Sequence, residues 1–134
     1  MQRNHLHLLV EAEDKRALSR GMQGLQIRLA RRLNAAIGRA GKLFADRYHA
    51  HVLSTPREVR HALAYVLNNA KKHLRQAGRT VSKRWIDPCS TARRFFADRE
   101  AGSRKHRGLR VAQTWLLSVG WALKGTVTPA TVPK

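Results

Sequence analysis

The chain of 134 residues has the length of one ordinary domain, and it carries 27 Lys and Arg against 8 Asp and Glu, a formal net charge of +19. Such a charge indicates a polyanionic partner, and the usual polyanions are nucleic acid and anionic membrane. A hydrophobic fraction of 43% excludes a purely disordered basic tail, and a single cysteine, Cys89, excludes an internal disulfide. Because no apolar run approaches the roughly 20 residues of a membrane helix and the N-terminus does not resemble a signal peptide, we expect a soluble, cytoplasmic domain.

The first two expected elements are a short strand and a long basic helix. Residues 6–10 (LHLLV) form an apolar run that favours a strand. From about Lys15 to Ala40, apolar residues recur every three or four positions, which predicts one face of a helix. That face comprises Leu18, Met22, Leu25, Leu29, Leu33 and Ile37. Gly38 and Gly41 suit the end of this helix, because glycine tolerates the left-handed conformation common at C-caps.

A second extended segment and a second helix follow. Residues 42–53 (KLFADRYHAHVL) are rich in aromatic and β-favouring residues, which predicts a strand or an extended segment. Thr55 can cap the next helix and Glu58 completes a capping box. We expect this helix to run to about Gln76, with Gly78 as its stop. Its apolar face comprises Val59, Ala62, Leu63, Val66, Leu67, Ala70 and Leu74.

Beyond residue 78 the pattern loosens into a basic C-terminal extension, 79–134, which we expect to be mainly helical or irregular. Residues 100–110 are a basic, glycine-containing linker. Residues 114–124 predict a short apolar helix or packing segment, in which we expect Trp115 and Trp121 to belong to the core rather than to contact bases. Residues 126–134 are expected to form a loose tail.

Two pairs of side chains are candidates for chemistry. In a strand, His5 and His7 would project to the same side, where two imidazoles can hold a divalent cation. Taken alone, such a pair is more often two histidines on the polar side of a strand. Tyr65 lies roughly 130° from the centre of its helix's apolar face, and Asn69 follows it by one turn. A lone tyrosine is usually half-exposed on a solvated face.

Four motifs follow one another along the chain. Residues 4–10 read NHLHLLV, residues 18–23 read LSRGMQ, residues 41–48 read GKLFADRY and residues 65–69 read YVLNN. In this order they resemble the single-tyrosine HUH transposases, especially the REP-associated tyrosine transposases, which are insertion-sequence-200-like. The resemblance covers roughly residues 4–78. It implies an α+β fold, a ferredoxin-like sandwich, with a catalytic core in residues 1–78.

The resemblance also implies a site and a reaction. His5, His7 and Asn69 would bind Mg²⁺ or Mn²⁺ and so polarise a phosphate of single-stranded DNA, near a hairpin. Tyr65 would attack that phosphate, leaving a 5′-phosphotyrosine and a free 3′-hydroxyl, so that strands can be rejoined without ATP. The implied setting is DNA transposition in a prokaryotic nucleoid, and monomer and homodimer both remain open.

Basic and aromatic side chains are candidates for DNA contact. Nine Lys or Arg and a single acid, Asp46, lie between residues 15 and 47. We expect salt-sensitive phosphate contacts from Arg20, Arg28, Arg31, Arg32 and Arg47. Tyr48, Trp85 and Phe95 could stack on bases, although such residues more often pack.

The chain departs from the family pattern at its start. In the family the strand with both histidines is internal, preceded by two strands and a helix, whereas this sequence begins at that motif. We therefore expect an incomplete sandwich of strand, helix, strand and tyrosine helix. A misassigned start, a decayed gene or a partner chain that supplies the strands would each explain this, and a two-stranded sheet is marginal alone.

Three functions remain open. The first is a DNA strand transferase, as an active enzyme or an inactive truncated copy. The second is a non-catalytic basic nucleic-acid-binding protein that binds by charge alone, and the third is a small RNA-binding structural protein. A membrane-surface role ranks last, because the long basic helix lacks Trp or Phe on its apolar face.

Overall fold

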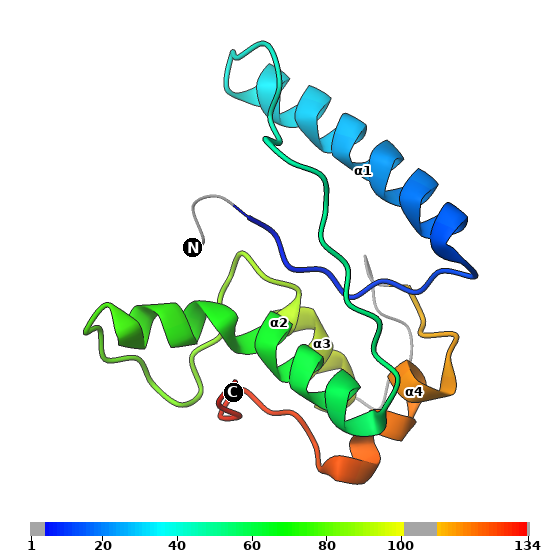
Figure 1. Cartoon of the computed structure of the whole chain (residues 1–134). Helices are drawn as coiled ribbons and strands as arrows, with labels where there is room; N and C mark the ends of the chain where they lie inside the picture. Colours follow the sequence, from blue (N-terminus) through cyan, green and yellow to red (C-terminus); the bar gives the residue numbers. More distant parts are fainter. Residues whose placement is uncertain (1–4, 101–109, 134) are drawn as a thin grey trace. The chain divides into compact units, whose positions relative to one another are not determined.

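The computed structural model describes residues 5–100 and 110–133 and is helical there (Figure 1). Its elements are the α-helices α1 (Lys15–Ala36), α2 (Pro56–Gln76), α3 (Ala92–Glu100) and α4 (Trp115–Ser118), and the 3₁₀-helix η1 (Gly120–Lys124). These described residues contain no strand. The predicted α+β fold, an incomplete ferredoxin-like sandwich, is therefore wrong.

The two predicted strands are irregular connections. A strand needs a neighbour to accept and donate its backbone hydrogen bonds, and this requirement cannot be seen in a local sequence pattern. Residues 6–9 and residues 42–52 belong to different compact units of the chain. The β-favouring composition of both segments therefore yields extended backbone without a sheet.

The chain divides into two compact units. The first unit joins the start of the chain, up to Leu9, with everything from Leu53 onward, and the second is Val10–Val52. Within the described residues, no helix is long and apolar enough to cross a membrane. Most of the predicted linker at residues 100–110 lies outside the described residues.

Helix α1 fills most of the second unit. Asp14 caps it by accepting a hydrogen bond from the Ala17 backbone nitrogen at 2.6 Å. The helix ends four residues before the predicted Ala40, and Gly38 follows with φ 64°. Every residue of α1 keeps at least partial exposure, so its apolar face is only half-covered.

Helix α2 is the central element of the first unit. The predicted capping box is present: Thr55 Oγ1 accepts from the Glu58 nitrogen at 3.2 Å, and Glu58 Oε2 accepts from the Thr55 nitrogen at 2.9 Å. The predicted end at Gln76 is confirmed, and Gly78 has φ 73°. The core packs around α2 and comprises Val59, Leu63, Ala64, Leu67, Ala92, Phe96, Trp121 and Val127.

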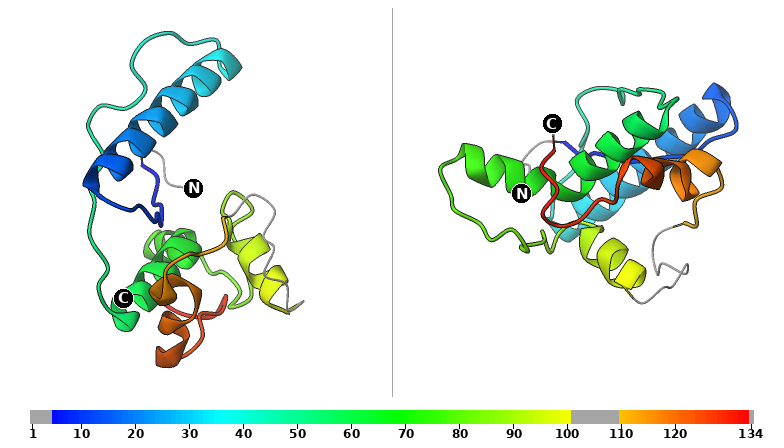
Figure 2. Two further views of the ribbon diagram at one scale, coloured as in Figure 1. Left: turned by 90° about the vertical axis from the view of Figure 1, so that its right-hand side faces the viewer. Right: turned by 90° about the horizontal axis from the view of Figure 1, so that it is seen from below.

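Residues 126–133, which we call the strap, are bound to α2, so the prediction of a loose tail is wrong. Figure 2 shows the strap crossing α2 in the view from below. The Asn68 amide nitrogen donates to the carbonyl oxygens of Thr128 and Thr131, both at 3.0 Å. Val127 is 2% exposed and anchors the strap in the core.

A buried lysine makes the second attachment of the strap. Lys71 is 4% exposed, and its ammonium donates to the carbonyl oxygens of Pro129 at 2.6 Å and Lys83 at 2.7 Å. Burial first, and the charge of Arg75 second, lower the pKa of Lys71 below its usual value. Two carbonyl acceptors compensate for this loss of solvent.

The two tryptophans of the C-terminal segment differ in their surroundings. Trp121 is 4% exposed and belongs to the core, as predicted, whereas Trp115 is 57% exposed. The prediction that Trp115 belongs to the core is therefore wrong, because the apolar pattern of residues 114–124 does not show which ring faces α2.

Candidate functional site

Three of the predicted site residues lie together in the first unit. His7 Nε2 is 3.4 Å from Tyr65 Oη, and the two rings meet edge to face with centroids 4.8 Å apart. The ring of His5 packs on His7 in the same way, with centroids 4.8 Å apart and planes at 83°. The fold thus brings together two imidazoles and a phenol, although His7 and Tyr65 lie 58 residues apart in sequence.

The histidines reach α2 on an extended arm, residues 5–9. Leu9 packs against the core of the first unit, and His7 is half-buried. Leu6 and Leu8, which alternate with them, are 62% and 48% exposed. The period-two geometry that the sequence predicts is therefore present in the arm although no sheet forms.

Asn69 is the fourth predicted residue and lies one turn after Tyr65 on α2. It is 5% exposed, and neither its side-chain oxygen nor its nitrogen has a hydrogen-bond partner within the described residues. Leaving a buried amide unsatisfied costs roughly 1–3 kcal/mol per group. Such a residue needs an explanation, and a missing ligand is one.

The electrostatic environment favours a neutral His7 and places a cation beside Tyr65. Burial is the main cause that lowers the pKa of His7, followed by the charges of His5 and His73. The ammonium of Lys72 lies 5.8 Å from the centroid of the Tyr65 ring, within the range of a cation–π contact. A neutral imidazole is the form that can accept a hydrogen bond or bind a metal ion.

The donor types of the three predicted ligands, imidazole nitrogen and amide oxygen, are ones that a divalent cation accepts. The described residues contain no group of three His, Cys, Asp or Glu side chains, so a third ligand must come from another residue type. The unpartnered oxygen of Asn69 is such a donor, and imidazole nitrogen with amide oxygen is a donor set that divalent ions accept. His5 and His7 carry the nitrogens of this set.

The predicted phosphate-binding arginines all lie in the second unit, and their side chains are exposed. They are Arg20, Arg28, Arg31, Arg32 and Arg47. Arg47 lines a shallow hollow with Gln26, Ile27, Ala30 and residues 41–46.

The predicted stacking residues are packed more than exposed. Tyr48, Trp85 and Phe95 are all half-buried. The ring of Phe95 packs edge to face on Phe96 and lies 6.1 Å from the ring of Trp121. Phe95 is therefore part of the core packing.

Lys72 and His73 were not among the predicted site residues. Lys72 follows Tyr65 by seven residues and lies about 20° from it around the helix, whereas His73 follows by eight and lies about 80° away. Helical spacing was therefore a sufficient signal for Lys72 but not for His73.

Comparison of the chain with protein-family models, with curated proteins and with solved structures gave no match. The family resemblance therefore stays a prediction that depends on the four motifs. The observed arrangement of His5, His7 and Tyr65, with Asn69 one turn further along α2, is therefore the structural basis for a proposed function.

Proposed function

We propose that this chain is a DNA strand transferase that cuts and rejoins single-stranded DNA through a covalent bond to Tyr65. The observation that carries the proposal is the 3.4 Å contact between Tyr65 Oη and His7 Nε2. Two separate motifs select His7 and Tyr65, which lie 58 residues apart in sequence. A contact between two residues chosen in this way is not expected by chance.

The chemistry follows from the groups at the site. Tyr65 Oη forms a bond to phosphorus while the bond from phosphorus to the 3′-oxygen breaks, and its proton goes to solvent. The 3′-oxygen takes a proton and leaves as a hydroxyl, and the reverse step rejoins a strand. Lys72 favours negative charge near the phenol, and His7 orients the hydroxyl. Mg²⁺ or Mn²⁺ held by His5, His7 and Asn69 would supply positive charge at the phosphate.

Covalent trapping tests this proposal. Labelled single-stranded hairpin oligonucleotides are incubated with the chain and Mn²⁺, and products are separated on a denaturing gel. We expect a heat-resistant protein–DNA band that Tyr65→Phe abolishes. Tyr48→Phe is the matched control, because Tyr48 is the chain's other tyrosine and belongs to the second unit. An adduct that survives Tyr65→Phe contradicts the proposal.

The metal is tested separately from the adduct. Titration calorimetry with Mn²⁺ should show binding that His7→Ala removes and that His49→Ala leaves unchanged. His49 and His51 form the chain's second pair of alternating histidines, so this control matches the motif. Equal loss in both variants would mean non-specific binding of Mn²⁺.

A specific observation favours a second candidate, non-catalytic binding of nucleic acid. Helix α1 carries exposed arginines and contains no acidic residue. Charge alone would give this function, so binding would withstand both Tyr65→Phe and a chelator. Salt-sensitive binding without any adduct would select this candidate.

A further inference from the structure

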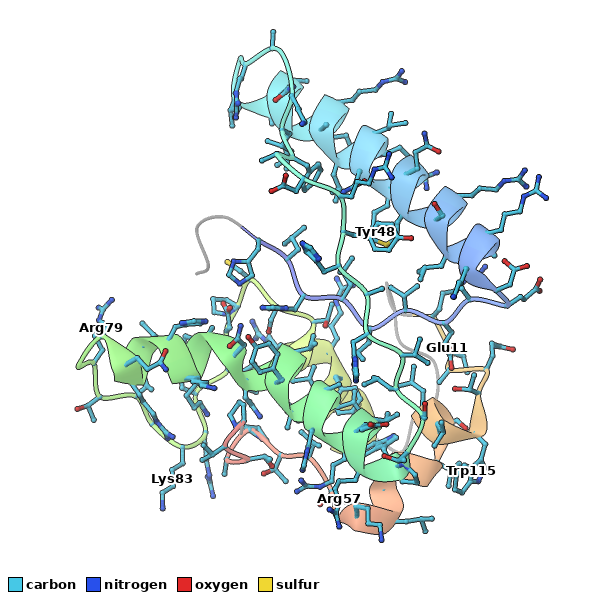
Figure 3. The ribbon with its side chains drawn as sticks, in the orientation of Figure 1. Glu11, Tyr48, Arg57, Arg79, Lys83 and Trp115 are labelled. Atoms are coloured by element: carbon cyan, nitrogen blue, oxygen red, sulfur yellow. The ribbon has the colours of Figure 1, made fainter. Side chains whose placement is uncertain are left out.

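Trp115 is exposed and yet held in a fixed position. A Cβ atom at Gly120 would lie 2.7, 2.8 and 3.0 Å from the ring atoms Cζ3, Cε3 and Cη2. The near equality of these distances shows that Gly120 lies over the face of the six-membered ring and not beyond its rim. Because 57% of Trp115 is exposed, the opposite face of its ring is open to solvent. Figure 3 shows Trp115 at the outer side of α4.

Position 120 requires glycine, because a side chain there would clash with the Trp115 ring. Its φ is not among the positive values that occur at Gly38, Gly41, Gly78 and Gly125, so the backbone itself would accept alanine. The clash with the ring is what excludes a side chain there. The close fit therefore fixes the orientation of the indole.

Further contacts hold the backbone of Trp115. Its carbonyl oxygen accepts from the Val119 nitrogen at 2.9 Å and from Ser118 Oγ at 3.3 Å. Thr114 caps the helix through its side chain, and Trp121 anchors the following segment in the core. An aromatic ring held in this way loses little freedom when a ligand stacks on it.

The charge around this ring selects the ligand. No acidic residue follows Glu100 in the sequence, and Arg110 and Lys124 are exposed on either side of Trp115 along the chain. Arg60 also reaches this segment, because its Nε donates to the Gly125 carbonyl oxygen at 2.9 Å. A segment that presents a flat apolar ring, carries exposed basic residues and contains no acidic residue fits a ligand that combines flat rings with negative charge.

We propose that Trp115 is a stacking platform for an unpaired base of single-stranded nucleic acid. The inference builds on the proposed function, since both require a single-stranded ligand, but it does not require Tyr65 to react. A duplex hides the faces of its bases, whereas a single strand presents them to an aromatic ring. Arg110 and Lys124 hold the adjacent phosphates.

Binding of oligonucleotides to the full chain in EDTA tests the platform without any cleavage. Trp115→Ala should weaken binding of an oligothymidylate roughly 5- to 100-fold, the range expected when one stacked base no longer has its aromatic partner. Trp115→Phe should retain most of the affinity. Gly120→Ala should weaken binding, because its Cβ displaces the ring.

An abasic oligonucleotide of the same length and charge separates stacking from phosphate contact. We expect the unchanged chain and Trp115→Ala to bind it equally well. Leu123→Ala is the matched control, because Leu123 is 67% exposed on the same segment. The platform is refuted if Trp115→Ala binds oligothymidylate normally. It is also refuted if Leu123→Ala weakens binding as much, which would indicate an apolar docking surface.

The outcomes remain distinct from those of the trapping assay. If the proposed function is wrong, no Tyr65-dependent adduct forms, but binding still depends on Trp115. Failure of the platform leaves the adduct intact and removes the difference between Trp115→Ala and the unchanged chain.

Discussion

Asn68 and Asn69 are adjacent on α2 and are both buried, but only Asn68 uses its amide. Asn68 donates to two carbonyl oxygens of the strap, whereas both polar atoms of Asn69 lack a partner within the described part of the chain. The first residue therefore stabilises the fold and the second one costs stability. A costly polar residue next to Tyr65 is what a ligand-binding role predicts.

Replacing Asn69 by the similarly sized Leu separates the two roles. We expect Asn69→Leu to raise the free energy of unfolding by roughly 1 kcal/mol, since it removes the unsatisfied amide groups. The same change should abolish Mn²⁺ binding. Urea denaturation and calorimetry measure the two effects. Asn68→Leu should have the opposite effect on stability, and a loss of stability in Asn69→Leu would argue against an unsatisfied amide.

At the scale of elements, the two long helices could be predicted from sequence, whereas strands could not, and α3 was covered only by the expectation of a mainly helical or irregular extension. The capping box at Thr55 and the spacing of α1 are local signals, and each involves residues within four positions. A strand depends on a distant partner, so residues 6–10 and 42–53 gave a false signal. The strap was missed because it has a single apolar anchor in the core, Val127, and its other attachments are polar side chains, Asn68 and Lys71. Hydropathy patterns do not register such contacts.

Within the candidate site the motifs predicted that Tyr65 and the two histidines belong together, and the helical period placed Asn69 one turn after Tyr65. The burial of Asn69 could not be predicted, because the sequence places it on the polar side of α2. Its surroundings depend on how α2 packs in the first unit, which is long-range information.

The attachment of the strap to α2 can be tested by changing Lys71. Lys71→Met leaves the carbonyl oxygens of Lys83 and Pro129 without a donor, so the free energy of unfolding should fall by roughly 1–3 kcal/mol. Hydrogen exchange over residues 126–133 should accelerate. Lys72→Met is the control, because the ammonium of Lys72 lies over the Tyr65 ring instead. Equal exchange in both variants would mean that Lys71 does not hold the strap.

At the scale of the whole molecule, the basic residues behind the net charge of +19 are spread over both compact units. The arginines of α1 are exposed and lie in a different unit from Tyr65. We therefore expect a division in which the arginines of α1 contact phosphates in addition to basic residues of the first unit, and the first unit alone holds the candidate reactive groups.

The salt dependence of binding tests this division. Changing Arg20, Arg28, Arg31 and Arg32 together to Gln should reduce the slope of log affinity against log salt by about 0.7 for each phosphate that these arginines no longer neutralise. The control changes four exposed arginines of the first unit, Arg57, Arg75, Arg79 and Arg84, and has the same net charge. Equal slopes in both variants would mean that net charge alone governs binding.

The arm at residues 5–9 has a further consequence. It belongs to the first unit, but its covalent connection to the rest of that unit runs through Val10–Val52. The two histidines therefore act as a tethered ligand of α2, and the second unit serves as the tether. Their encounter with Tyr65 is governed by an effective concentration, which the length of the tether and the packing of Leu9 determine. We therefore expect that shortening or stiffening the second unit changes how readily the two histidines contact Tyr65.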